Sequence, residues 1–82
     1  MTLDNKKQII TVDLHNMVKE QAKRYLEQLL NSISINVKEV HIIHGYHSGT
    51  TLQNMIQKCL KHPRIKQKIK SFNQGVTILY LK

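Results

Sequence analysis

Residues with β-branched side chains gather in four short runs, and these runs predict four strands. The runs lie at residues 9–14, 37–43, 69–72 and 76–81. Only residues 73–75 separate the last two runs, and Gly75 among them accepts a positive φ. We therefore expect the last two strands to form a hairpin.

Two stretches between these runs carry apolar side chains at helical spacing. The first stripe, at i, i+4, i+7, i+8 and i+11, consists of Val18, Ala22, Tyr25, Leu26 and Leu29. The second, at i, i+3, i+4, i+7 and i+8, consists of Leu52, Met55, Ile56, Cys59 and Leu60. We expect Asn16 to cap the first helix. The second helix should end near His62, because the residue before Pro63 is disfavoured in the α region. Both stripes are predicted to be core.

The resulting order, β-α-β-α-β-β, restricts the fold. Both β-α-β crossovers should be right-handed, which places both helices on the same face of the sheet. We therefore predict an α/β two-layer sandwich, in which a four-stranded mixed sheet has two helices on one face. The alternative, helices on both faces, requires more core than 82 residues supply. Residues 1–8 are predicted to be a flexible N-terminal segment before one domain at residues 9–82.

Charge divides the chain into two unequal parts. The formal net charge is +8, and all five acidic residues lie within residues 1–39. From Val40 onward the chain has seven Lys and Arg residues and no acidic residue. Such a one-sided field attracts polyanions, so nucleic acid, on its own or on a ribosomal surface, is the expected partner. The alternative is that the positive charge serves no specific partner.

A membrane is not an expected partner, and the expected compartment is the cytoplasm. No apolar run approaches the roughly 20 residues that span a bilayer, and the chain has no tryptophan-rich basic helix to lie on one. The N-terminus shows no secretory signal. A single cysteine, Cys59, excludes an internal disulfide and favours a reducing compartment.

Several polar side chains should meet where the first two strands end. Alternation places Asp13 and His15 on one face at the carboxyl end of the first strand, and His44 ends the second. If these strands are parallel, the three residues reach one edge of the sheet, where open α/β sheets bind ligands. The loop that follows leads into the second helix, and its N–H groups and hydroxyls can hold a phosphate. Its residues are Gly45, Tyr46, His47, Ser48, Gly49 and Thr50. Alternatively, the loop glycines serve only the turn and the histidines are structural.

Two further sets of side chains bear on binding. Lys66, Lys68 and Lys70 alternate and would share one face of an extended segment. They can follow a phosphate backbone or protect an edge strand from aggregation. His41 and His44 are metal-ligand types, but alternation puts them on opposite faces, so no metal site is predicted. Among the aromatic residues, we expect Tyr46 to be available for base stacking.

Three motifs resemble the Smr (small MutS-related) domain family. Residues 12–15, Val-Asp-Leu-His, followed by Ala22, resemble its L-D-L-H-G…A opening. Residues 42–45, Ile-Ile-His-Gly, with Gly49 and Leu52, resemble I-[HT]-G-x-G…L, and residues 75–81 resemble its closing G-V-T-V-x-x-L strand. The resemblance covers residues 9–82, as a short stand-alone member. It implies a fold similar to the C-terminal domain of bacterial translation initiation factor 3.

The resemblance also implies a function. Smr domains bind DNA or RNA, and several act as endonucleases that nick it, which carries over to Asp13 and His15 as catalytic residues, with His44 beside them. The family's glycine loop carries over to Gly45 and Gly49. Asn16 and His47 replace two family glycines, and Gln53 replaces a common basic residue. The alternative is a non-catalytic RNA- or ribosome-binding module. No cofactor is specified, and dependence on a divalent metal is left open. A third alternative, a protein–protein adaptor, would require a sizeable exposed apolar patch.

Overall fold

The structure, a computed structural model, describes residues 8–45, 49–72 and 75–82. Its elements are β1 (Gln8–Asp13), α1 (Lys19–Ser32), β2 (Val37–Ile43), α2 (Gly49–Asn54), the π-helical turn η2 (Met55–Cys59), β3 (Ile65–Lys70) and β4 (Val76–Leu81). The four strands form one sheet in the order β1-β2-β4-β3. Strands β1 and β2 are parallel, while β4 is antiparallel to both of its neighbours.

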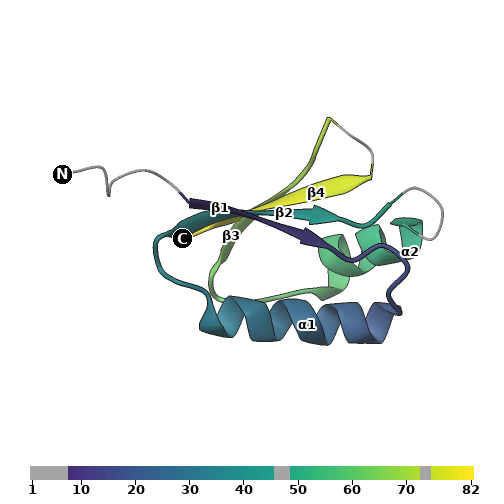
Figure 1. Cartoon of the computed structure of the whole chain (residues 1–82), viewed down its shortest axis with the longest axis horizontal. Coiled ribbons are helices and arrows are strands. Elements are labelled where there is room, and N and C mark those ends of the chain that lie inside the picture. The colour runs from purple at the N-terminus through teal and green to yellow at the C-terminus, as the bar shows by residue number, and fades with distance from the viewer. Residues whose placement is uncertain (1–7, 46–48, 73–74) are drawn as a thin grey trace.

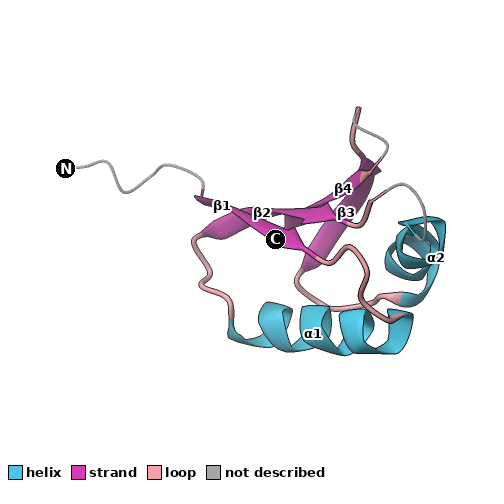
Figure 2. Cartoon of the chain, turned by 45° about the vertical axis from the view of Figure 1, so that its right-hand side comes forward, coloured by secondary structure: helices cyan, strands magenta, loops and turns pink. Residues whose placement is uncertain are grey.

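The helices lie on one side of the sheet (Figures 1 and 2). This arrangement confirms the predicted two-layer α/β sandwich with a mixed sheet. The predicted flexible segment, residues 1–8, lies outside the described residues except for Gln8, which starts β1. No helix in the described ranges is both long and apolar enough to cross a bilayer.

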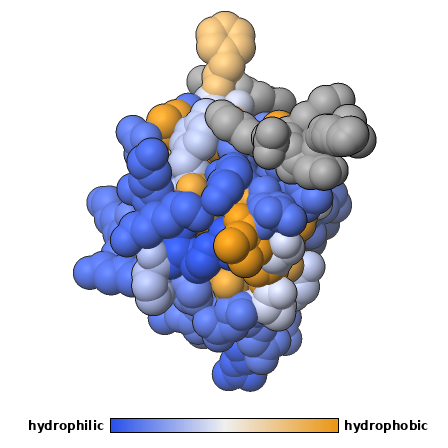
Figure 3. Space-filling model, turned by 90° about the vertical axis from the view of Figure 1, so that its left-hand side faces the viewer, coloured by the Kyte–Doolittle hydropathy of each residue, from blue (hydrophilic) through white to orange (hydrophobic). Residues whose placement is uncertain are grey.

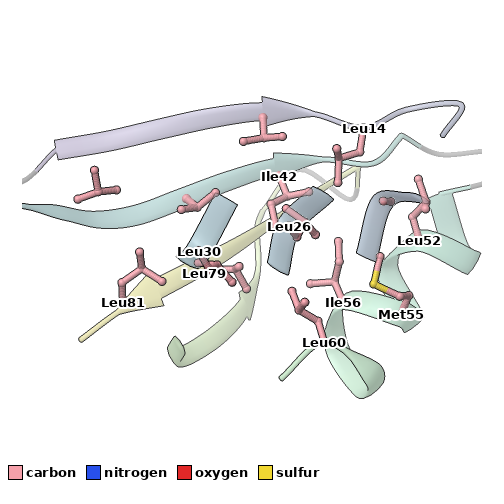
Figure 4. Close-up of a cluster of buried hydrophobic side chains, with 14 residues drawn as sticks. Leu14, Leu26, Leu30, Ile42, Leu52, Met55, Ile56, Leu60, Leu79 and Leu81 are labelled. Atoms are coloured by element: carbon pink, nitrogen blue, oxygen red, sulfur yellow. The ribbon is translucent and has the colours of Figure 1, made fainter. Parts of the chain in front are cut away.

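The core fills the space between the sheet and the helices (Figure 4). Alternate positions of the strands supply one wall, and Val40, Ile42 and Leu79 are fully buried there. The second helical stretch supplies the opposite wall, where Leu52, Met55, Ile56 and Leu60 are at most 2% exposed. Burying this apolar surface is the main source of stability in a domain of this size.

Helix α1 buries a narrower stripe than predicted. Its buried residues are Ala22, Leu26 and Leu30, spaced four apart. The prediction that Val18 is core is wrong: it is 57% exposed, because it precedes the helix in an extended conformation. Tyr25 is also exposed, and Leu29 is only partly buried against the core. The buried face therefore keeps Ala22 and Leu26 of the predicted stripe and continues to Leu30 in place of Leu29.

The second helical stretch ends in a wider turn. The Leu60 N–H donates to the Met55 carbonyl oxygen across 2.8 Å, a bond between residues five apart. Such a turn holds more residues than an α-helical turn, so each residue rotates less around the axis. Leu60 therefore reaches the core, whereas Cys59 turns outward to solvent. The prediction that Cys59 is core is wrong for this reason.

The connection from β1 to α1 is a tight turn. The Met17 N–H donates to the Leu14 carbonyl oxygen across 3.0 Å, and Asn16 between them has a φ of 70°. A turn whose third residue has a positive φ favours glycine or asparagine at that position. Val18, and not Asn16, occupies the N-cap position of α1. The prediction of an Asn16 cap is therefore wrong, and Asn16 serves the turn instead.

Strand β3 lies earlier in the sequence than predicted. It covers Ile65–Lys70 and forms one edge of the sheet, whereas Phe72 lies beyond its end. A register shift between Ile65 and Gln67 marks a β-bulge in its pairing with β4. The bulge interrupts the alternation that reveals strands in a sequence. The lysines and the bulge also protect this edge against pairing with another chain.

Candidate functional site

Asp13 and His15 form a hydrogen-bonded pair at the carboxyl end of β1. One carboxylate oxygen of Asp13 accepts hydrogen bonds from the His15 backbone N–H at 3.1 Å and from the ring nitrogen Nδ1. The side chains are 51% and 57% exposed, respectively. Both lie on the open face of the sheet, because the alternate residues Val12 and Leu14 are buried in the core.

The hydrogen bonds of the pair define the charge of Asp13 and the tautomer of a neutral His15 ring. The hydrogen bond from the His15 ring, helped by that from the His15 backbone, lowers the pKa of Asp13. Asp13 is therefore an ionised acceptor at neutral pH, and Nδ1 of His15 must carry the proton that it shares. In the neutral ring, the lone pair is then on Nε2, and none of the described residues bonds to that atom. An exposed imidazole held in this tautomer can accept or deliver a proton.

Gly45 lies next to this pair. Strands β1 and β2 are parallel, with Asp13 opposite Ile43, so the residues after each strand meet at one edge as predicted. Gly45 has a φ of 84°, and a Cβ built on it would lie 3.5 Å from Cβ of His15. Its N–H donates to the Gly75 carbonyl oxygen across 3.1 Å. This N–H therefore holds the edge together and is not directed at a phosphate.

His44 lies at the same edge but on the other face of the sheet. It is 1% exposed, and its alternation partners Val40 and Ile42 are also buried. Its Nδ1 is 3.2 Å from the Gly45 carbonyl oxygen, and its Nε2 is 3.0 Å from the Thr77 hydroxyl. Burial lowers the pKa of His44, which keeps the ring neutral: Nδ1 donates and Nε2 accepts.

His44 is therefore a buried connector between β2 and β4. We expected His44 to meet Asp13 and His15 over one phosphate. In the structure, His44 is buried on the helix side of the sheet, whereas Asp13 and His15 lie on the open face. The alternation already implied this, since His44 falls in phase with Val40 and Ile42. Thr77 was missed as its partner, although it is a hydroxyl in phase with the buried Leu79 and Leu81. A buried polar group at such a position needs a hydrogen-bonding partner.

The predicted phosphate loop is only partly described. Tyr46, His47 and Ser48 lie outside the described residues, so their predicted roles stay predictions. Gly49 and Thr50 form the first two residues of α2, so the helix begins inside the predicted loop.

The three predicted lysines have different surroundings. Lys68 pairs with Leu79 and Lys70 with Thr77, so both lie on the helix side of β3, while Lys66 lies in the bulge. The ammonium of Lys68 donates to the carbonyl oxygens of Leu60 and, at 3.3 Å, of Gln57. These carbonyls end the second helical stretch, where a cation is favourable. Burial, with nearby Lys61, lowers the pKa of Lys68. Lys66 and Lys70 are exposed.

Arg64 has a similar structural role at the end of α1. Its guanidinium donates to three carbonyl oxygens, those of Ile33 and Ser34 at 3.3 Å and that of Val37 at 3.1 Å. Together with Lys68, it shows that part of the basic series binds backbone oxygens inside the fold.

The described residues offer no ready metal centre. No three His, Cys, Asp or Glu side chains gather there in a group that could hold an ion. His41 lies on the open face, where its Nε2 is 2.9 Å from a Glu39 carboxylate oxygen, away from the buried His44. A resident divalent ion needs several such ligands at once, and the described residues do not supply them.

Comparison with known proteins agrees with the sequence motifs. The family model of the Smr domain matches residues 12–82. The chain belongs to the Smr domain family. Among solved structures, the Smr domain of Thermus thermophilus MutS2 matches with a TM-score of 0.73 and 19% sequence identity. That match covers 89% of this chain and 98% of the other, and it confirms the fold. No curated protein matches the chain.

The structure explains how this Smr domain accommodates one departure from the family motif. The L-D-L-H-G opening has Asn16 at its glycine, and Asn16 adopts the left-handed conformation that glycine takes most easily. Asparagine is among the few other residues that tolerate it. The change therefore preserves the turn that presents His15.

Proposed function

We propose that this Smr domain binds nucleic acid and cleaves its backbone with the Asp13–His15 pair. The Smr family is associated with nucleic-acid binding and nicking. The observation that carries the proposal is the geometry of the pair: an ionised carboxylate holds an exposed imidazole by Nδ1. The same relation between a carboxylate and a histidine orients the general base in many hydrolases.

In this mechanism each residue has one task. Asp13 orients the ring of His15 through its hydrogen bond to Nδ1. His15 removes a proton through Nε2 from the attacking water, or from a ribose hydroxyl if the substrate is RNA. As that oxygen bonds to phosphorus, the P–O bond to the leaving oxygen breaks, and the leaving oxygen takes a proton from solvent or from the protonated His15 ring. His44 does not take part in proton transfer; it holds β2 against β4 through Thr77. Gly45 leaves room beside His15, because its missing Cβ would otherwise contact that side chain.

Binding rests on the basic part of the chain. Residues 40–82 carry no carboxylate side chain, so their field attracts a phosphate backbone. Lys66 and Lys70 are exposed cations on β3, whereas Lys68 is held by backbone carbonyls. Hydrophilic residues cover most of the face seen in Figure 3, and apolar residues show there in small groups. That face does not offer the sizeable apolar patch that a protein adaptor would need.

Cleavage assays on matched variants test this proposal. Wild-type protein, Asp13→Asn and His15→Ala are incubated with supercoiled plasmid, linear duplex and structured RNA, with and without divalent cations. Both variants should lose cleavage by about 100-fold or more, the usual contribution of general acid–base catalysis. Binding should stay within a few-fold of wild type, because the basic surface is intact. Glu27→Gln, which removes a carboxylate on α1 whose side chain is 40% exposed, is the matched control and should cleave normally.

Three results would count against the proposal. Cleavage that survives both Asp13→Asn and His15→Ala would assign the activity to another site or to a contaminant. Binding without cleavage of any substrate would favour a non-catalytic RNA- or ribosome-binding module. A protein that binds none of these nucleic acids would contradict the proposal as a whole.

A further inference from the structure

Phe72 is an aromatic side chain with no place in the core. Its relative solvent exposure is 104%, the largest among the exposed apolar side chains described, and Ile35 is next at 74%. A phenylalanine side chain stabilises a folded protein when its ring is buried, so a fully exposed ring contributes nothing to the free energy of unfolding. The ring of Phe72 is therefore fully available to a binding partner.

The fold brings Phe72 to the edge that carries the Asp13–His15 pair. Phe72 follows the end of β3, where the Ser71 N–H donates to the Val76 carbonyl oxygen across 3.1 Å. The adjoining Gly75 carbonyl oxygen accepts the His44 and Gly45 N–H groups at 2.8 and 3.1 Å. Gly45 in turn lies beside His15. A continuous series of contacts thus joins the hairpin to the candidate catalytic pair.

The distance along this edge suits a nucleic-acid strand. The order β1-β2-β4-β3 places three strand spacings between β1 and β3, which is about 14 Å at about 4.8 Å per spacing. A nucleic-acid strand covers this length in about four nucleotides at the spacing found in a duplex. A strand whose phosphate lies at His15 can therefore place a base a few nucleotides away over Phe72.

The charge around Phe72 favours the same partner. Lys70, two residues earlier, is exposed on the same strand end, and no carboxylate side chain occurs anywhere from Val40 to Lys82. An exposed aromatic ring beside an exposed cation, on a part of the chain that has no acidic residue, matches the stacking platforms of single-strand binding surfaces. An acidic or neutral surround would instead have favoured a protein partner.

We propose that Phe72 is a base-stacking site for unpaired nucleotides, which makes single-stranded or locally unpaired nucleic acid the preferred ligand. This inference rests on the proposed function, and it specifies the class of substrate. The ring face stacks on an unpaired base of any identity, while the ammonium of Lys70 binds the phosphate backbone. Bases inside a regular duplex are already stacked on one another and gain little from Phe72.

Fluorescence provides a direct test, because the chain contains no tryptophan. Phe72→Trp introduces a single reporter at the proposed site, and Ile35→Trp introduces one at an exposed position before β2, at the opposite end of the strands. A single-stranded oligonucleotide should quench the first protein strongly and the second little. Quenching of both to the same degree, or of neither when binding is established by another method, would overturn the proposal.

Affinity measurements complete the test. Phe72→Ala should weaken single-strand binding by about 5- to 150-fold, the range found when a stacking aromatic is removed. It should leave duplex affinity and the salt dependence nearly unchanged, because no phosphate contact is lost. Phe72→Leu, which keeps an apolar side chain without a ring, should be as weak as Phe72→Ala, and Phe72→Trp should restore affinity. Thermal unfolding should be the same for all four proteins, since the side chain is exposed.

The outcomes separate this inference from the proposed function. If wild type and Phe72→Ala bind single strands equally, the stacking site is wrong while nucleic-acid binding stands. If Phe72→Leu binds like wild type, a general apolar contact replaces stacking. If sedimentation shows that wild type self-associates and Phe72→Ala does not, the ring serves a second copy of the chain instead. If wild type binds no nucleic acid, the proposed function itself fails.

Discussion

At the scale of single residues, His44 shows how burial turns a candidate catalytic group into a structural one. Its ring is shielded from solvent, and both of its nitrogens have hydrogen-bonding partners inside the fold. A protonated ring would have to donate from Nε2 to a hydroxyl that now donates to it. The geometry therefore selects the neutral ring, in agreement with the lowered pKa of His44.

This selection predicts a pH dependence of stability. The folded-state pKa of His44 lies below that of the unfolded chain, which is about 6.5. As the pH falls below about 6.5, the unfolded chain takes up a proton that the folded protein does not, so the unfolded state is favoured. The contribution of His44 is thus fully present above pH 6.5 and is lost as the pH falls toward the folded-state pKa.

Urea unfolding of wild type and His44→Gln between pH 7.5 and pH 4.5 checks this prediction. The variant cannot titrate, so the difference in free energy of unfolding between the two proteins should narrow as the pH falls below about 6.5. His15, His41 and His62 are present in both proteins and cancel in the difference. Parallel pH profiles would show that His44 is protonated as easily in the folded protein as in the unfolded chain.

At the scale of elements, the two apolar stripes show that helical spacing predicts the buried residues in the middle of a helix better than those at its ends. Ala22 and Leu26 lie where the periodicity puts them, because the middle of an α-helix follows it closely. The ends do not: Val18 precedes the helix, and Cys59 lies in a wider turn that the spacing of apolar residues does not reveal.

The same scale yields a prediction for α1. Leu30 is 2% exposed, whereas its neighbour Leu29 is only partly buried. Leu30→Ala should therefore cost about 2–5 kcal/mol in the free energy of unfolding. Leu29→Ala should cost about 1 kcal/mol, close to the average for point substitutions. Equilibrium unfolding in urea measures both, and a larger loss for Leu29→Ala would show that the helix presents a different face to the sheet.

Much of the candidate site also follows from the sequence at this scale, and the remainder has identifiable causes. Strand alternation and parallel pairing bring Asp13, His15 and Gly45 together, as predicted. The hydrogen bond that makes a pair of Asp13 and His15 was not predictable, because it depends on the conformations of two side chains at a turn. Strand β3 was misplaced because a bulge and four polar positions hide its alternation.

At the scale of the whole molecule, some of the basic side chains are free to bind a partner, whereas others stabilise the fold. Lys66 and Lys70 are exposed, but Lys68 donates to carbonyl oxygens at the end of the second helical stretch. Net charge alone therefore overstates the number of cations available to a phosphate backbone.

This division predicts different effects for three similar substitutions. Lys66→Gln and Lys70→Gln should each lower the slope of log affinity against log salt concentration by about 1, if each contacts one phosphate. Lys68→Gln should leave that slope unchanged and instead reduce the free energy of unfolding by about 1 kcal/mol, because the helix end loses its cation. Binding isotherms at several salt concentrations, with urea unfolding of each variant, measure both quantities. A reduced slope for Lys68→Gln with unchanged stability would show that its ammonium leaves the helix end to bind phosphate.

The strand order has a consequence for the way the chain is made. Strands β1 and β2, with α1 between them, can pair as soon as both have left the ribosome, because their parallel ladder needs no later residue. Strand β3 has no such option, since among the described strands it pairs with β4 alone, which is synthesised after it. The nascent chain therefore carries an unpaired lysine-rich strand until β4 inserts between β2 and β3. Repulsion between the lysines of two such nascent chains opposes pairing of their unpaired β3 strands. The same charges that attract a polyanion to β3 therefore also protect β3 from aggregation during synthesis.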